Sequence, residues 1–486
     1  MRFIYFTCCI LGLSSCAVGP DFKSPAAPQV ISYVKGGNPS AISANEKDTH
    51  GATQHLSEAS VKKEWWQAFG NEQLNQMVQV ALHHNPNLES LQQTLVSATQ
   101  NALALDRSLS LPGVNANLSE TKQRFNPASF GQPSPPSIFS LTNASVNVAY
   151  NLDLFGGVRR QLEASYAEAQ SQAYTYEAAK ITLIANVITT AISRAQVKNQ
   201  LVLTRTMIQQ QEELFGITKT RYQLGALSPS DVASAKESLA QMRQSLPALI
   251  SRYQRLDHQL AVYLGQTPAQ SRLADLDLST IQLPQDLPLS VPSTLIRQRP
   301  DILNAEALLH AATAQVGVAL SGEYPNITLN ATYGTLSANP NSIFSRNSAV
   351  WSLSSGIVQP LFHGGALEAQ TAAAKASLKS AALTYQQTVL NAFQNVADSL
   401  TTLEADGQNL DQSHQSFEAT LEELSVMQTQ FETGSMSYIQ LLNAKLHQEQ
   451  SAIGLLQAQA DRLNDTAAFF LALGGGWNSD TLSSKQ

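Results

Sequence analysis

The chain has 486 residues, a net charge of −7 and a charged fraction of only 14%. Ordinary soluble domains are about 25% charged, so the composition is unusual for a plain globular protein of this length. No Lys/Arg run is longer than a pair, which leaves no electrostatic footprint for a phosphate backbone. Nucleic acid is therefore not expected as a partner.

The N-terminus reads MRFIYFTCCILGLSSCAVGPDF. One arginine, a short apolar stretch and small residues before Cys16 are typical of a secretory signal peptide, which we place at residues 1–15. The segment LSSC is similar to a bacterial lipobox, whose cysteine receives a diacylglyceryl group and becomes the new N-terminus. Cys8 and Cys9 leave with the signal, so Cys16 is the expected lipidation site and no disulfide is possible. A plain signal peptide that contains a cysteine is the alternative.

Residues 16–63 are polar and contain scattered prolines, which predicts an extended, lipidated N-terminal tether. Ala17 follows the cysteine where some lipoproteins carry Asp, and this choice favours sorting to the outer membrane. No later segment supplies 18 unbroken apolar residues, so the sequence predicts no transmembrane helix. Any membrane crossing must then use strands.

Two long gaps in proline predict very long helices. No proline occurs in residues 137–228, and none occurs from residue 361 onward. If residues 364–433 form one helix, it is roughly 105 Å long. Apolar residues in the second gap recur at intervals of seven, which predicts left-handed supercoiling: Val389, Val396, Leu403, Leu410, Phe417, Leu424 and Phe431. An ordinary helical bundle is the alternative.

Both gaps end at a similar turn. RYQLGALSPSDV occupies residues 221–232, and QFETGSMSYIQL occupies residues 430–441. Their glycines, Gly225 and Gly434, stand 209 positions apart (434 − 225). Each glycine fits the left-handed position that ends a helix, and the serines that follow it offer N-caps for a returning helix.

The returning helices also end at matching glycines, Gly265 and Gly474, again 209 positions apart. The chain therefore contains a tandem duplication. We place the first repeat at residues 64–265, a proline-rich linker region at 266–299, the second repeat at 300–474 and a C-terminal tail at 475–486.

Each repeat contains two strand candidates between its helices. They begin at Pro112 and Ala144 in the first repeat, and at Pro325 and Ala349 in the second. In the segment from residue 144, apolar side chains alternate with Ser and Asn, which is typical of a half-buried strand. A membrane β-barrel strand with a wet lumen shows this pattern over about ten residues, and a soluble sheet shows it too.

In the barrel reading, the polar face of this strand lines the lumen and includes Asn147, Asn151 and Asp153. Four strands cannot close a barrel, and lipid tolerates no open sheet edge, so the chain must oligomerise if it spans a membrane. Two chains give eight strands and three give twelve. A wet lumen favours twelve, because eight-stranded barrels are filled by side chains.

Several motifs together resemble one family. They are CAVGPDF from Cys16, WWQAFGNEQL from Trp65, ALHHNPNL from Ala81, LDLFGG and PLFHGG after the strands, and RQRPDILNAEALLHAATAQVGVALSGEYPNITLNATYG from Arg297. The mature chain resembles the outer-membrane efflux factors, which are TolC-like channels of tripartite pumps, in their lipoprotein branch of NodT or OprM type.

The resemblance implies a mainly α fold with a membrane β-barrel portion. Long coiled-coil helices form an α-barrel, and four strands per chain contribute to a trimeric twelve-stranded barrel. The expected function is passive conduction of drugs or other solutes across the outer membrane. The expected partners are two further copies of the chain, outer-membrane lipid, a periplasmic adaptor (membrane fusion) protein and an inner-membrane pump, usually proton-driven.

Under this resemblance the two turns form the periplasmic tip and contact the adaptor. The residues expected there are Arg221, Tyr222, Gly225, Ser228, Phe431, Gly434 and Ser437. Some members carry carboxylates six and nine residues after the second turn glycine, where this chain has Gln440 and Asn443. Asp231 is the one carboxylate at the matching positions of the first repeat. With Asp231, Gln440 and Asn443 at the pore entrance, a trimer is at most a weak cation filter.

Catalysis has no sequence support. The chain contains no GxxxxGK[ST], HExxH, CxxC or GxSxG motif, and its nine histidines are dispersed. No enzyme activity, cofactor or metal is therefore expected. A third class, a lipid-anchored periplasmic coiled-coil tether without conductance, explains the lipobox and the heptads. It does not explain the alternating strands.

Overall fold

The computed structural model describes residues 17–44, 47, 48, 50–127, 131, 133 and 135–477. The described chain forms two compact units. The first contains residues up to 25 together with residues 94–173 and 304–386, and the second contains the remainder. Cys16, the predicted lipidation site, lies outside the described residues.

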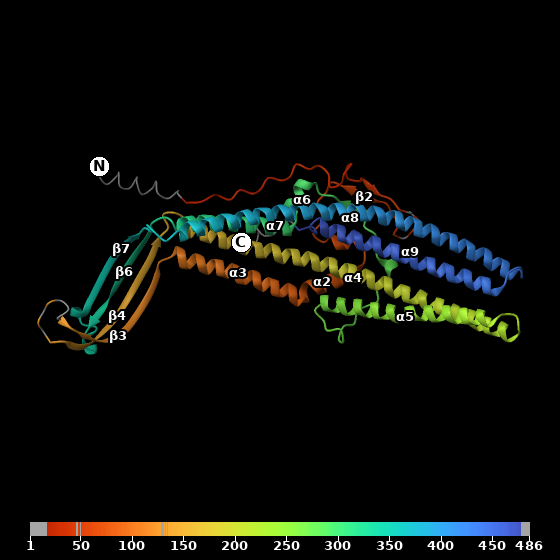
Figure 1. Cartoon of the computed structure of the whole chain (residues 1–486), viewed down its shortest axis with the longest axis horizontal. Helices are drawn as coiled ribbons and strands as arrows, with labels where there is room; N and C mark the ends of the chain where they lie inside the picture. Colours follow the sequence, from red (N-terminus) through yellow and green to blue (C-terminus); the bar gives the residue numbers. More distant parts are fainter. Residues whose placement is uncertain are drawn as a thin grey trace. The chain divides into compact units, whose positions relative to one another are not determined.

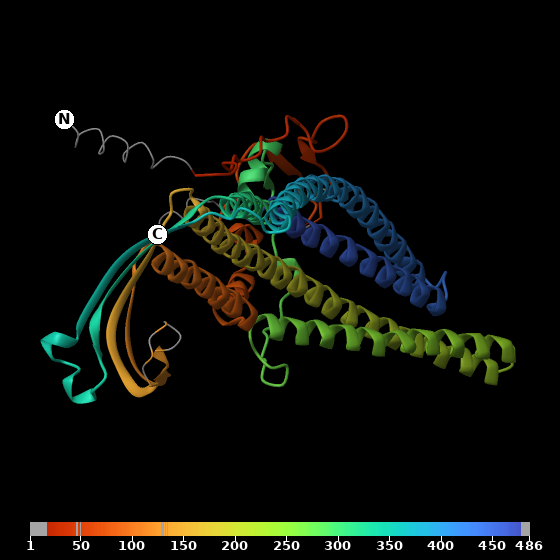
Figure 2. The same ribbon diagram turned by 60° about the vertical axis from the view of Figure 1, so that its left-hand side comes forward.

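The first unit contains a four-stranded antiparallel sheet (Figure 1). Its strands are β3 (Gly113–Phe125), β4 (Ser137–Leu152), β6 (Asn326–Ser337) and β7 (Ala349–Val358), in the order β3-β4-β6-β7. Each repeat contributes one hairpin, and the central β4–β6 pair joins the two repeats. The four strands lie side by side and curve along their length (Figure 2).

Two α-helices precede each hairpin, and three of these four helices begin at a proline. α2 (Glu72–His84) ends just before Asn85, and α3 (Pro86–Ser110) follows; Asn85 Oδ1 accepts a hydrogen bond from the Leu88 amide at 3.1 Å. Before the second hairpin, α6 (Pro292–Gln298) at the end of the linker region and α7 (Pro300–Ser321) at the start of the second repeat occupy the corresponding positions. Proline suits the first helical position because the missing amide would have no partner there.

The long helices occur in two equal pairs. α4 (Gly157–Gln223) and α8 (Ala366–Glu432) have 67 residues each, and α5 (Pro229–Tyr263) and α9 (Tyr438–Ala472) have 35 each. Every one of these bounds recurs after 209 residues, so the predicted duplication is confirmed. Among the helices of the described chain, none combines the length and the hydropathy needed to cross a membrane.

The second unit contains a small sheet of β1 (Ala41–Ile42), β2 (Gln54–Ser57) and β5 (Asp286–Pro288), in the order β1-β2-β5. Residues 16–63 were predicted as an extended tether, but β2 pairs in parallel with β5 of the linker region. The short 3₁₀ helices are η1 (Trp65–Phe69), η3 (Leu278–Thr280), η4 (Pro340–Ser342) and η5 (Arg346–Ser348).

The core of the second unit forms around the WWQAF segment. Trp65 stacks on Phe470 of α9, with ring centroids 5.0 Å apart, and Phe69 is fully buried against the same cluster. Ile188 of α4 is also fully buried there. Burial of one such side chain contributes about 1.5–3 kcal/mol. The motif therefore stabilises the packing of α4 and α9 in this core and does not form a surface site.

Candidate functional site

The turn between α4 and α5 has the geometry of a Schellman helix end. Gly225 has φ +77°, and its amide donates to Tyr222 O at 2.9 Å. The Ala226 amide donates to Arg221 O, also at 2.9 Å. This pairing of amides with the last helical carbonyls requires a left-handed residue at the turn, which glycine adopts without steric cost.

The turn between α8 and α9 repeats this geometry. Gly434 has φ +76°, its amide donates to Phe431 O at 3.0 Å, and the Ser435 amide donates to Gln430 O at 2.9 Å. All seven residues predicted for the tip are exposed in the described structure: Arg221, Tyr222, Gly225, Ser228, Phe431, Gly434 and Ser437.

The predicted entrance residues serve as helix caps. Asp231 Oδ2 accepts from both the backbone amide and the hydroxyl of Ser228, each at 2.7 Å. Gln440 Oε1 accepts from the amide and the hydroxyl of Ser437 at 3.1 and 2.9 Å. These are capping boxes at corresponding positions of the two repeats. The hydrogen bonds from Ser228 hold the pKa of Asp231 below its usual range.

Asn443 is exposed on the second turn of α9 and lies one helical turn beyond Gln440. A contact between the repeats lies nearby: the Tyr438 hydroxyl hydrogen-bonds to Glu213 of α4, and this bond raises the pKa of Tyr438. Sequence reasoning missed this pair, because nothing in a single repeat predicts a contact with the other.

The four-stranded sheet has one apolar and one polar face. Strand register aligns Ala116, Val146, Tyr333 and Trp351 in one row across all four strands. Val146 is 44%, Tyr333 67% and Trp351 76% exposed. Large apolar side chains exposed in a contiguous strip mark a surface that binds protein or lipid.

The row on the opposite face is polar and contains Asn115, Asn147, Thr332 and Ser352. Thr332 donates its hydroxyl hydrogen to Asn147 Oδ1 at 2.8 Å. Asn151, also predicted to face the lumen, is aligned with Thr328 on this same face. The outer strands β3 and β7 pair on one side only within the described sheet.

The prediction that Asp153 lies on the strand is wrong. β4 ends at Leu152, so Asp153 lies beyond the strand whose alternation suggested a lumen-facing side chain. Its carboxylate accepts from the backbone amides of Val158 and Arg159, each at 3.0 Å. Asp153 thus caps the N-terminus of α4, where the free amides and the helix dipole favour a negative charge.

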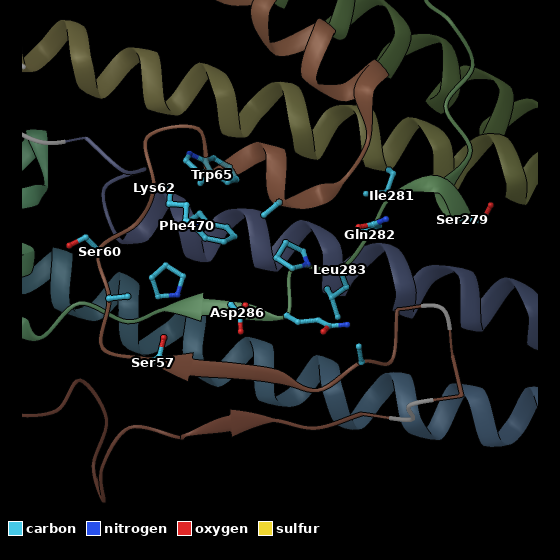
Figure 3. Close-up of a pocket in the computed structure, with 16 residues that line it drawn as sticks. Ser57, Ser60, Lys62, Trp65, Ser279, Ile281, Gln282, Leu283, Asp286 and Phe470 are labelled. Atoms are coloured by element: carbon cyan, nitrogen blue, oxygen red, sulfur yellow. The ribbon is translucent and has the colours of Figure 1, made fainter.

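A cavity of about 610 Å³ lies beside the WWQAF segment, and Figure 3 shows the residues that line it. Trp65 and Phe470 line one side, and Gln282 and Asp286 of the linker region line another; Lys62 adds one cation. These side chains contain no nucleophile paired with a base. In the part of the chain that the structure describes, no group of three His, Cys, Asp or Glu residues could hold a metal ion.

A buried charged cluster, also missed from the sequence, lies between α8, α9 and the N-terminal segment. Arg462 is 0% exposed and donates to Ala52 O at 2.9 Å. Burial lowers its pKa to about 10. Burial, together with a hydrogen bond to Asp465, raises the pKa of Asp406 to about 7. Gln459 holds Asp48 of the N-terminal segment through two hydrogen bonds of 2.8 and 3.1 Å.

Comparison with known proteins gives matches along nearly the whole chain. The profile of the family described as "Outer membrane efflux protein" matches residues 77–266 and 291–475. The antibiotic efflux pump outer membrane protein ArpC of Pseudomonas putida is 28% identical over 479 residues, which cover 98% of this chain and 95% of ArpC. Outer membrane protein OprJ of Pseudomonas aeruginosa is 28% identical over 472 residues, 96% of this chain and 94% of OprJ.

The fold gives the same result. The solved outer-membrane channel OprN matches with a TM-score of 0.82 and 25% identity, over 95% of this chain and 100% of that chain. The family profile matches twice, once in each repeat that the structure shows. The resemblance read from the sequence is thereby confirmed. The chain belongs to the outer membrane efflux protein family, and it is the outer-membrane channel of an efflux system.

Proposed function

We propose that three copies of the chain close their sheets into one twelve-stranded barrel that crosses the outer membrane. The observation that carries this proposal is the sheet itself. It exposes an apolar face that includes Trp351 and Tyr333, and its edge strands β3 and β7 each lack a second neighbour within the described chain. Lipid covers such a face, but it tolerates no unpaired backbone edge. Neighbouring copies supply the missing partners.

In the closed barrel the polar row with Asn147, Asn151 and Thr332 faces the lumen and keeps it wet. The helices α4, α5, α8 and α9 of three copies form the periplasmic tunnel, with the turns at Gly225 and Gly434 at its tip. The exposure of all seven tip residues supports a role in contact with a periplasmic adaptor. Asp231, Gln440 and Asn443 border the pore entrance.

The assembly is tripartite: an inner-membrane pump, proton-driven in our proposal, passes solutes through the adaptor into this passive channel. Relatives named for antibiotic and toluene efflux support small organic solutes as cargo. The diacylglyceryl group on Cys16 attaches the protein to the outer membrane in addition to the barrel. The lipobox-like LSSC segment supports this modification.

Planar-bilayer recording on the purified protein tests the channel proposal, and adjacent residues of β7 supply matched variants. Trp351 lies in the apolar row and Ser352 in the polar row. An Arg in the middle of the lipid face of a barrel costs about 2–4 kcal/mol, so W351R prevents insertion and abolishes stepwise currents, whereas S352R keeps them.

A non-conducting tether, the alternative read from the sequence, gives a different result. The membrane-bound wild-type protein would then carry no current, and W351R and S352R would behave alike. Either result would overturn the channel proposal for this chain.

A further inference from the structure

Residues 17–25, which we call the leader, lie on a fitted surface in the first unit. The Val18 amide donates to Phe155 O at 3.0 Å, and Arg160 Nε donates to Val18 O at 3.4 Å. Both backbone groups of Val18 are therefore paired. A segment that only trailed from the molecule would leave these groups to water, so the contacts indicate specific docking.

Side chains of the leader contribute three further contacts. Arg160, only 6% exposed, reaches Asp21 at 2.5 Å. The ring of Phe22 stacks on His310 of α7, with centroids 4.3 Å apart and planes 15° apart. Ser24 donates to Glu306 of α7 at 2.5 Å. Hydrogen bonds to a charged partner are roughly twice as strong as neutral ones.

The receiving surface is itself ordered by a hydrogen-bonded chain. Glu163 accepts from Arg160 at 2.7 Å through one oxygen, and its other oxygen lies 2.8 Å from His310 Nε2. Glu163 therefore fixes both groups that meet the leader, the guanidinium and the imidazole. Such side chains, held by neighbours before contact, lose less entropy on binding.

The fit is closest where two glycines meet. A Cβ on Gly19 would lie 2.5 Å from Gly317 Cα, and a Cβ on Gly317 would lie 2.8 Å from Val18 O. Gly19 also has φ +97°, which L side chains rarely adopt. Only glycine at both positions allows the leader backbone to lie directly on α7.

The leader begins beside the segments that join the four-stranded sheet to its helices. Phe155 follows β4 by three residues, and it stacks on Tyr324, which precedes β6 by two, with centroids 4.9 Å apart. A Cβ on Gly156 would lie 2.6 Å from Ala17 Cβ. Ala17 is joined to Cys16 by one peptide bond, so docking ties the lipidation site to the junctions where the strands begin and end.

We propose that the surface formed by Phe155, Arg160, Glu163, His310 and Gly317 is a docking site for the chain's own leader. Docking holds the lipid of Cys16 at the base of the sheet and so turns the sheet toward the bilayer before the trimer inserts. This inference rests on the proposed lipidation and barrel. Its physical basis is effective concentration, because a short tether of fixed direction keeps the strands at the membrane surface.

Insertion of an eight-residue spacer tests whether the docked leader orients the sheet or only tethers the chain to the membrane. Placed between Cys16 and Ala17 and beginning with alanine, it preserves the residue that follows the cysteine and gives the lipid about 16 Å of free reach. The same spacer between Ala26 and Ala27 lengthens the chain equally but leaves the lipid tied to the dock. Both are compared in the full-length protein made in cells.

Three readouts are taken on each variant. Mass spectrometry of the N-terminal peptide reports lipidation, hydrogen exchange of residues 17–25 reports docking, and pulse-chase labelling with chemical cross-linking reports trimer formation. We expect the first spacer to keep lipid and docking but to slow trimer formation roughly tenfold. The second spacer leaves the rate at the wild-type value.

Two point variants test the dock itself. F22A removes the stack on His310 without touching the body of the protein, and G317A places a methyl group against Val18 O. Both lose exchange protection in the leader and form trimers slowly. G216A is the matched control, because a Cβ on Gly216 of α4 meets nothing within 4 Å.

Equal trimer rates for the two spacers overturn the proposal, as do unchanged leader protection and trimer rate in F22A. If Cys16 of the wild-type protein carries no lipid, the proposal fails with its premise. The currents predicted for the channel would still be observed in that case, so the two failures are distinguishable.

Discussion

Asp231 and Gln440 occupy the same position in the two repeats, 209 residues apart (440 − 231), and each closes a capping box on the serine before its helix. One box uses a carboxylate and the other an amide. The two helix starts therefore have nearly the same geometry but differ in charge. This difference makes each cap a control for the other.

The first prediction concerns pH. The folded-state pKa of Asp231 is lowered by hydrogen bonds from Ser228, so its stabilisation of α5 is present above the unfolded pKa and is lost as pH falls through the folded value. Hydrogen exchange should show the first-turn amides of α5 losing protection on acidification. Those of α9, capped by Gln440, should change only with the intrinsic exchange rate. Equal behaviour of the two turns would contradict this account.

The second prediction concerns removal of the cap. S228A removes a hydroxyl that bonds to Asp231, and loss of an N-cap costs about 1 kcal/mol. Local protection in the first turn of α5 should fall roughly fivefold, with no change at the end of α5 near Tyr263. S238A is the control, because Ser238 is an exposed serine of the same helix whose hydroxyl donates to Ser234 O and does not contact the capping box. Protection lost equally in both variants would refute the cap.

The third prediction concerns ions. Among the three proposed entrance residues only Asp231 is charged, and its carboxylate is already bonded to Ser228. A trimer therefore presents only three carboxylates among the proposed entrance residues, each already accepting hydrogen bonds from Ser228, and we expect a modest cation preference or none. Reversal potentials under a salt gradient should stay close to zero and shift little in D231N. Strong selectivity that D231N leaves unaltered would assign the filter to other residues.

The sequence predicted both turns and their serine caps because helix ends follow local rules. Left-handed glycines and N-cap serines act within six residues of each other, at Gly225 and Ser228 as at Gly434 and Ser437. The same locality explains the failure at Asp153. In the sequence, the alternation of apolar and polar residues continues past Leu152. In the structure the strand ends there, and the Asp153 carboxylate accepts hydrogen bonds from the first amides of α4.

The fourth prediction concerns the buried cluster. The pKa of Asp406 is raised to about 7, first by burial and then by its bond to Asp465. The folded protein therefore favours the protonated form, and stability falls as pH rises from about 4 through 7. With allowance for solvent access, the loss is on the order of 1 kcal/mol. Thermal unfolding at pH 5 and pH 8 should show a higher midpoint at pH 5.

The variant D406N flattens this pH dependence, because the amide cannot ionise. E422Q is the control, since Glu422 is an exposed carboxylate on the same helix. If D406N and E422Q show the same profile as the wild type, Asp406 does not carry the effect. Arg462, Asp461, Asp465, Asp48 and His50 are the other titratable groups of this region.

The fifth prediction concerns the close contact of α8 with the N-terminal segment. A Cβ on Gly407 would lie 2.6 Å from Ser43 O and 3.3 Å from Ile42 Cγ2. G407A forces the backbones apart and should destabilise the protein by about 1–3 kcal/mol. G216A, in open space on α4, should stabilise it by up to about 1 kcal/mol. Chemical unfolding midpoints that move in the same direction would refute the contact.

Long-range pairs were beyond sequence reasoning. Arg462 meets Ala52 across 410 positions and Tyr438 meets Glu213 across 225, and no local period encodes such partners. Residues 16–63 looked like a tether because their prolines and polar residues predict no helix. Their pairing with β5 depends on backbone hydrogen bonds, which any side chain permits.

The central claim is that one copy cannot seal its own sheet and that three copies together enclose a conduit. The mass of the assembly extracted from outer membranes in mild detergent, measured by native mass spectrometry, tests this claim most directly. We expect three acylated chains in one particle. A stable particle of a single chain that needs no detergent would contradict the account, because Trp351 and its row would then be covered within one molecule.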